Sequence, residues 1–173
     1  RRGFAAVTIA RCGRAAICER QEKPVEHKLT FLDGAMGTML QRHGLKLGEI
    51  PELLAITNPD LLTNIHRQYI EAGTEIVYAN TFGANRRKMQ KTPYTVADVV
   101  SAAIAAAKKA CIGTSARVAL DIGPLGELLE PMGTLPFETA VDMFAEIVDA
   151  GVNAGADLIC IETMTDLYEA KAA

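Results

Sequence analysis

Four short apolar segments recur along the chain at intervals of 40–46 residues, and each ends in a side chain that can bind a ligand. They span residues 29–33, 75–80, 117–121 and 157–162. Short apolar runs of this kind predict buried β-strands. Each run is followed by a long segment that contains a helical pattern, and strands joined through helices lie parallel in a sheet. The chain is therefore predicted to be an α/β protein.

The helices between these strands have recognisable starts. Asn58 before a proline, Thr95 with an acid three residues later, and Pro136 each predict the beginning of a helix. We expect Phe137 to face inward on the helix that Pro136 opens. Another helix is expected to begin near residues 165–166.

The ends of the four predicted strands decide between two parallel architectures. The terminal side chains are Asp33, Asn80, Asp121 and Glu162. Barrel enzymes place functional residues at the carboxyl ends of many strands, whereas doubly wound sheets concentrate them at one switch point. We therefore expect the first half, about four β/α units, of a (β/α)8 TIM barrel, since a whole barrel takes about 250 residues. Such a half barrel has an open strand edge on each side, and open edges favour self-association.

Charge divides the chain into two parts. Residues 1–28 carry seven Lys or Arg and three Asp or Glu, which is the composition of a leader or of upstream sequence. Residues 29–173 are acidic, which argues against nucleic acid as a partner. No apolar run approaches the roughly 20 residues that a membrane helix needs. The four cysteines fit no zinc-finger spacing, so we expect unpaired thiols in the cytoplasm.

Two strand ends carry the groups expected to recognise charge. Asp33 is followed by Gly34 and Gly37, and a tight turn there would offer backbone N–H groups to a carboxylate or a phosphate. Asp33 itself could hold an ammonium. Glu162 follows an apolar strand, so its partly desolvated carboxylate needs a cation, such as an ammonium or a metal ion. The structural alternatives are a solvated turn at Asp33 and a salt bridge at Glu162.

The remaining candidates are weaker. Asn80 and Thr81 offer donors and acceptors at the second strand end, and Asp121 either binds a ligand or caps a loop. His66 is expected to be a partly exposed packing residue on its helix. Cys160 shares the strand face of Glu162, so we expect it in the barrel interior as part of the core.

Four motifs resemble one known family when taken in order. They read F-L-D-G-A-M-G-T-M-L from Phe31, Y-A-N-T-F-G-A-N from Tyr78, D-I-G-P-L-G from Asp121 and D-L-I-C-I-E-T-M-T-D-L-Y-E-A-K-A-A from Asp157. Together they resemble the homocysteine S-methyltransferase family over about residues 29–173. The resemblance is closest to the N-terminal homocysteine-binding module of the cobalamin-dependent methionine synthases. It implies a TIM barrel in which zinc holds homocysteine as a thiolate, which then attacks a methyl group to give methionine. Zinc is needed because a free thiol, with a pKa of about 8.5, is mostly protonated at neutral pH.

The resemblance also implies roles for individual residues toward L-homocysteine. Asp33 and Glu162 would hold the ammonium group. The carboxylate end would be held by Gly34, Ala35, Met36, Gly37, Thr38 and Thr163. The pocket and the adjacent mouth would be shaped by Asn80, Thr81, Asp121 and Gly123. None of these residues is expected to be catalytic.

The sequence departs from the family at the metal site. The three zinc cysteines of the family are expected beyond Ala173, and none of the four cysteines present matches them. We therefore expect that this chain grips the amino acid but is inactive alone. Modules for cobalamin and methyltetrahydrofolate would lie downstream in a full-length chain, while betaine or S-methylmethionine serves other relatives. The alternatives are a non-catalytic truncated product, or a lyase or aldolase built on another TIM barrel.

Overall fold

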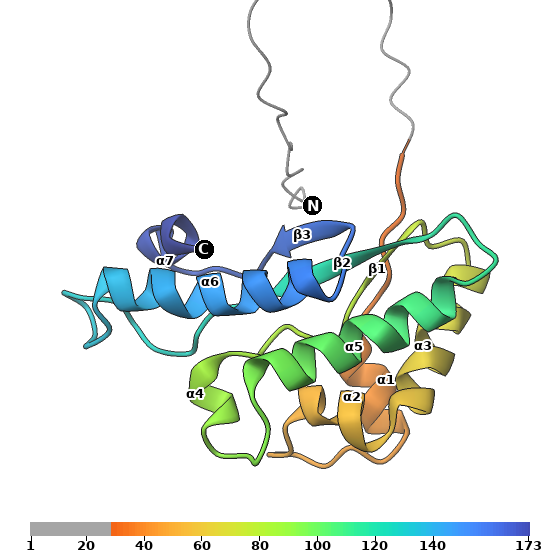
Figure 1. Cartoon of the computed structure of the whole chain (residues 1–173), viewed down its shortest axis with the longest axis horizontal. Helices are drawn as coiled ribbons and strands as arrows, with labels where there is room; N and C mark the ends of the chain where they lie inside the picture. Colours follow the sequence, from red (N-terminus) through yellow and green to blue (C-terminus); the bar gives the residue numbers. More distant parts are fainter. Residues whose placement is uncertain (1–28) are drawn as a thin grey trace, which may run out of the picture.

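Three parallel strands form the sheet of the computed structural model, which describes residues 29–173. The order β1-β2-β3 in the sheet is also the order along the chain (Figure 1). The strands are β1 (Ile76–Tyr78), β2 (Arg117–Ile122) and β3 (Leu158–Ile161). Each crossover thus adds the next strand on the same side, as in a (β/α)8 barrel. This confirms the predicted α/β class. The basic head, residues 1–28, lies outside the described residues.

The first predicted strand is reduced to a single bridge. Within residues 29–33, Leu32 pairs in parallel with Ile76. The N–H groups of Glu75 and Ile76 both donate to the carbonyl oxygen of Phe31, at 2.8 and 3.2 Å. The segment therefore runs beside β1, as expected, but the predicted strand over residues 29–33 is only a one-residue bridge. Pairing is limited to this short stretch because the chain turns away into a helix a few residues later.

The helices begin where local chemistry predicts. The Asn58 side chain accepts a hydrogen bond from the Leu61 N–H group, and Thr95 forms a capping box with Asp98. The elements, in chain order, are α1 (Met36–Arg42), η1 (Pro51–Leu53), α2 (Leu54–Thr57), α3 (Pro59–Glu71), α4 (Arg86–Met89), α5 (Val96–Cys111), α6 (Phe137–Asn153) and α7 (Leu167–Ala172). None of these helices is long and apolar enough to cross a membrane.

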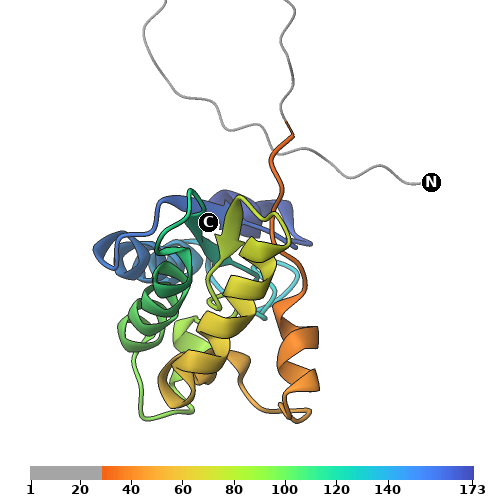
Figure 2. The ribbon, with the colours of Figure 1, turned by 90° about the vertical axis from the view of Figure 1, so that its right-hand side faces the viewer.

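Helices α3, α5 and α6 pack in a row on one side of the sheet, and α7 continues the row beyond α6 (Figures 1 and 2). Their shared core includes Ile65 of α3, Ile104 of α5 and Phe144 of α6, all 0–1% exposed. Phe137 is 38% exposed, so the expectation that it faces inward was wrong. The buried stripe of α6 instead begins one turn later, at Ala140. This layer holds the strands so that their carboxyl ends meet at one side.

Both lateral edges of the sheet expose apolar side chains. Leu29 and Phe31 are 73% and 61% exposed beside β1, and Ile159 and Ile161 are 41% and 38% exposed on β3. We expect the 173-residue chain to self-associate at micromolar concentrations, because unpaired strand edges template pairing. Sedimentation velocity over a concentration series measures this, and Phe31→Lys should weaken the association. A chain that stays monomeric throughout would contradict the prediction.

Candidate functional site

A cavity of about 410 Å³ opens at the carboxyl ends of the strands. It is lined by Asp33, Gly34, Ala35, Met36, Gly37, Pro51, Glu52, Tyr78, Ala79, Asn80, Phe82, Asp121 and Glu162. Four of these residues are acids, and they come from four separate segments of the chain. Sequence segments up to about 130 residues apart thus meet at one site, as the parallel arrangement predicts.

The structure brings most of the predicted site residues into this cavity. Eight of the twelve line it: Asp33, Gly34, Ala35, Met36, Gly37, Asn80, Asp121 and Glu162. Four do not, and these are Thr38, Thr81, Gly123 and Thr163. Thr163 is exposed and has a φ angle of 56°, an uncommon backbone conformation for a residue other than glycine.

The segment after Asp33 is a helix start and not the expected tight turn. Helix α1 begins at Met36, and no side chain caps it. The N–H groups in the first turn of a helix have no partner within the helix, and Met36 and Gly37 of this turn line the cavity. A Cβ atom on Gly34 would lie 3.0 Å from the Tyr69 ring, which explains why glycine fits there.

Asp33 is held by the neighbouring strand. Its Oδ2 atom accepts a hydrogen bond of 3.0 Å from the backbone N–H group of Tyr78, the last residue of β1. Its Oδ1 atom is buried without a hydrogen-bond partner. The side chain is only 2% exposed. A buried carboxylate oxygen without a donor is unfavourable unless a ligand supplies that donor.

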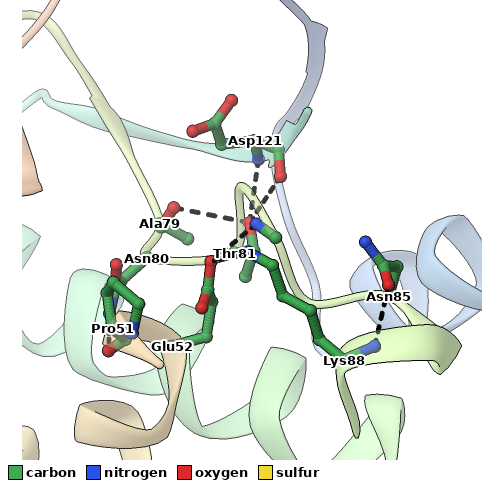
Figure 3. A network of polar contacts seen from close by, with 9 residues as sticks. Pro51, Glu52, Ala79, Asn80, Thr81, Asn85, Lys88 and Asp121 are labelled. Carbon is green, nitrogen blue, oxygen red and sulfur yellow. Dashed lines mark hydrogen bonds and ion pairs between the residues drawn. The ribbon is translucent and has the colours of Figure 1, made fainter. Parts of the chain in front are cut away.

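Asp121 is positioned by Thr81 through its backbone. The Thr81 hydroxyl donates to the Asp121 carbonyl oxygen at 2.8 Å and accepts from the Asp121 N–H group at 3.0 Å (Figure 3). The Asp121 carboxylate points away from Thr81 in Figure 3. Its Oδ1 atom is also buried without a partner. Thr81 therefore ties the ends of β1 and β2 together, and we assign it a structural place beside the cavity.

Glu52 is a site residue that the sequence analysis missed. It lies in η1, is 3% exposed, and accepts a hydrogen bond of 2.7 Å from the Gly83 N–H group through Oε1. Lys88 Nζ lies 3.5 Å from the same oxygen, while Oε2 is buried without a partner. Asn80 anchors the same turn by donating to the Pro51 carbonyl oxygen at 2.8 Å. Together these bonds fix η1 beneath the loop after β1.

Tyr78 is a second cavity residue with a polar group that the sequence analysis did not identify. The Cys160 thiol donates to the Tyr78 hydroxyl at 3.3 Å across the inner face of the sheet. Burial and the bond from Cys160 raise the pKa of Tyr78, so the phenol stays neutral. Burial also raises the pKa of the Cys160 thiol, which is therefore not an activated nucleophile. Cys160 is only partly buried and lies outside the hydrophobic core, so the expectation that it is part of the core was wrong.

Burial raises the pKa values of two cavity acids. Desolvation raises the pKa of Asp33 to about 7, with a smaller effect from the charge of Glu162. Desolvation raises the pKa of Asp121 to about 8, aided by Glu162, Asp33 and Glu52. Among the described residues, no Lys or Arg forms an ion pair with Asp33, Asp121 or Glu162. The cavity therefore favours a positively charged ligand, which would stabilise the ionised form of these acids.

Gly123 controls one wall of the cavity without lining it. A Cβ atom there would lie 2.5 Å from the ring of Phe82, and the Gly123 N–H group donates to the Phe82 carbonyl oxygen. We expect Gly123→Ala to lower the free energy of unfolding by about 1–3 kcal/mol, because the ring must leave its position. Urea unfolding followed by circular dichroism measures this. Gly37→Ala is the matched control, since nothing lies within 4 Å of its Cβ position. Equal destabilisation by both substitutions would contradict the prediction.

Comparison with known proteins decides the family. The family model described as Homocysteine S-methyltransferase matches residues 30–173, which is most of the chain. The chain belongs to this family. It is 35% identical over 155 residues to the methionine synthase of Mycobacterium tuberculosis and 34% identical over 156 residues to that of Mycobacterium leprae. Each match covers 82% of this chain and 13% of the relative, so the chain spans about an eighth of the length of these relatives.

Solved structures support the fold of this family member. The metallated form of the Escherichia coli homocysteine methyltransferase MmuM superposes with a TM-score of 0.73 at 23% identity. The match covers 84% of this chain and 58% of MmuM. The apo form of MmuM gives a TM-score of 0.63 at 24% identity. The three-stranded open sheet thus matches part of a TIM barrel, which confirms the predicted architecture.

A metal site of the kind implied for this family is not formed by the residues described. Within residues 29–173, no group of three or more His, Cys, Asp or Glu side chains is arranged to hold a metal ion. Cys111 and Cys160 are free and lie on different elements, α5 and β3. The four cavity acids therefore do not form a zinc site, and they fit an organic cation instead.

Proposed function

We propose that residues 29–173 bind the amino-acid end of L-homocysteine, in an enzyme that transfers a methyl group to its sulfur and forms methionine. The observation that carries this proposal is the cavity with four acids, of which Asp33, Asp121 and Glu162 form no ion pair with any Lys or Arg of residues 29–173. An α-ammonium group supplies three N–H donors and a positive charge. The family membership of the chain supports homocysteine as the amino acid.

In this proposal the ammonium group lies between Asp33 and Glu162. The free Oδ1 atom of Asp33 accepts one N–H bond, and the charge of the ligand favours ionisation of Asp33. Asp121 lies beside these two acids at the end of β2, and a bound cation would favour its ionisation as well. The pKa of Asp33 is about 7 in the free protein, so binding of the ammonium should release protons near neutral pH.

The carboxylate group of the ligand lies toward α1. Its acceptors meet the free N–H groups at the start of this helix, in the segment from Gly34 to Thr38. Thr163 directly follows Glu162, and we propose that it also helps to hold the carboxylate group of the ligand. Asn80 and Phe82 shape the wall that faces the rest of the amino acid.

The thiolate chemistry belongs to groups outside the cavity described. We propose that groups outside residues 29–173 would hold zinc, which would keep the sulfur as a thiolate, and that cobalamin and methyltetrahydrofolate would bind to further modules of a longer chain. Similarity to two methionine synthases supports this choice over betaine or S-methylmethionine as methyl donor. The thiols of Cys111 and Cys160 are unpaired, which fits a reducing compartment. Location in the cytoplasm remains a prediction.

The proposal is tested by calorimetric titration of L-homocysteine into the purified 173-residue chain, with and without zinc. We expect binding that does not depend on zinc, and binding of L-methionine as well, because both ligands share the ammonium and carboxylate groups. Circular dichroism establishes that the chain is folded. A folded chain that binds neither amino acid would overturn the proposal.

Methyl transfer itself is a separate measurement. The residues described supply a grip for the amino acid and no metal group, so we expect no methylation of homocysteine by this chain alone. Turnover by the purified chain would contradict this expectation. Family membership favours methyl transfer over the lyase and aldolase alternatives. Absence of both binding and turnover would favour a non-catalytic product.

A further inference from the structure

His66 is buried beside Asp33, one of the residues that line the cavity. It is on α3 and is 0% exposed, so the expectation of a partly exposed packing residue was wrong. Both ring nitrogens, Nδ1 and Nε2, are buried without a hydrogen-bond partner. A buried imidazole with two unsatisfied nitrogens is unfavourable and calls for an explanation beyond packing.

The carboxylate of Asp33 lies close to this ring. Nδ1 of His66 lies 3.9 Å from Oδ2 of Asp33. A movement of about 1 Å would bring the two atoms to hydrogen-bond distance. Hydrogen bonds at binding sites often tighten in this way once the ligand is present. Oδ2 already accepts from the Tyr78 N–H group, so the two oxygens of Asp33 differ: Oδ2 faces protein donors and Oδ1 is free.

Glu162, at the end of β3, opposes ionisation of Asp33 by raising its pKa, and the charge of Asp33 in turn raises the pKa of Asp121. Tyr69 on α3 also faces Asp33, and its own pKa is raised by burial and then by the charge of Asp33. Among the described residues, no Lys or Arg forms an ion pair with Asp33. An N–H donor next to Oδ2 would therefore matter most when Asp33 becomes charged.

We propose that His66 is a positioning residue for Asp33, which donates from Nδ1 to Oδ2 when the carboxylate ionises to receive the ammonium group of the ligand. This inference rests on the proposed function, because it assumes that Asp33 binds the ammonium. Burial lowers the pKa of His66 to about 4, so the ring is neutral and acts as an N–H donor, without adding a charge. The bond fixes the tautomer with the proton on Nδ1 and orients Oδ1 toward the cavity.

Two substitutions separate this role from packing. His66→Leu fills a similar volume but has no donor, whereas His66→Asn places an amide N–H group near the position of Nδ1. L-Methionine is the probe, since it has the ammonium and carboxylate groups but no thiol that titrates. We expect His66→Leu to bind L-methionine about tenfold more weakly at pH 7, with the pH midpoint of binding about one unit higher. His66→Asn should remain within about twofold of the unsubstituted chain.

A second measurement needs no ligand and keeps the two proposals apart. Titration of the Asp33 carboxyl carbon by ¹³C NMR in the free chain should show a higher pKa in His66→Leu than in His66→Asn. The ¹⁵N shifts of His66 should show a proton on Nδ1 above pH 7. If the chain binds no amino acid but these shifts are found, the proposed function fails and the coupling of His66 to Asp33 stands. Equal Asp33 titration in all three proteins, or a proton on Nε2, would overturn the role of His66.

Discussion

Asp33→Asn should weaken binding of L-homocysteine by about 100-fold at pH 8. The substitution keeps the shape of the side chain and the acceptor for the Tyr78 N–H group, but it removes the charge that the ammonium needs. Removal of one partner from a buried, hydrogen-bonded charge pair typically costs 2–5 kcal/mol, and about 3 kcal/mol corresponds to this factor. Glu162→Gln should act in the same direction through the other side of the ammonium. Calorimetric titration measures both changes.

The effect of Asp33→Asn on binding should be larger at pH 8 than at pH 6, because the Asp33 carboxyl group is mostly ionised only at the higher pH. The pKa of Asp33 is about 7, so the unsubstituted chain should bind L-homocysteine more weakly at pH 6 than at pH 8. Asp33→Asn should lose most of this pH dependence. Asp149→Asn is the matched control, because it removes the same charge from an exposed position on α6. If Asp33→Asn and Asp149→Asn bind equally well, Asp33 does not contact the ammonium.

Local sequence patterns predicted the strand ends because the relevant physics is local. An apolar run followed by an acid or amide specifies a buried strand with a polar end. Parallel pairing then brings Asp33, Asn80, Asp121 and Glu162 to one side of the sheet, whatever their separation along the chain. The same reasoning overstated residues 29–33, since a strand pattern does not tell how far pairing extends before the chain turns away.

Glu52 could not be found in this way. Its burial comes from bonds between η1 and the loop after β1, which is about 30 residues further along the chain. No pattern around Pro51 and Leu53 indicates these bonds. His66 is different, because a signal existed: Leu62, Ile65 and Tyr69 define a helical face, and His66 falls within the same stripe. The prediction of partial exposure followed from the polar character of His66, whereas its position on this helical face determined that it is buried.

Asp121→Asn should stabilise the free protein at alkaline pH. The pKa of Asp121 is raised from 3.8 to about 8, chiefly by burial, so the folded chain holds this proton more tightly than the unfolded chain. The stability from this group is complete below about pH 4 and is lost as the pH rises through about 8. An amide in the same place stays neutral. We expect a gain of about 2 kcal/mol at pH 8.5, allowing for solvent in the cavity, and almost none at pH 4.5.

Urea unfolding at the two pH values, compared with the unsubstituted chain, isolates this effect. His66 titrates in the opposite sense, with a folded pKa of about 4, but its contribution is common to both proteins and cancels in the difference. Asp149→Asn should change stability little at either pH, because its carboxylate is exposed.

A gain in stability of equal size at pH 4.5 and 8.5 would show that the amide acts through better packing and not through removal of the charge. A loss at pH 8.5 would show that the Asp121 carboxylate already has a partner in the free protein. The expected result would instead mean that the acids of the cavity destabilise the free fold, and that a bound ammonium offsets this cost.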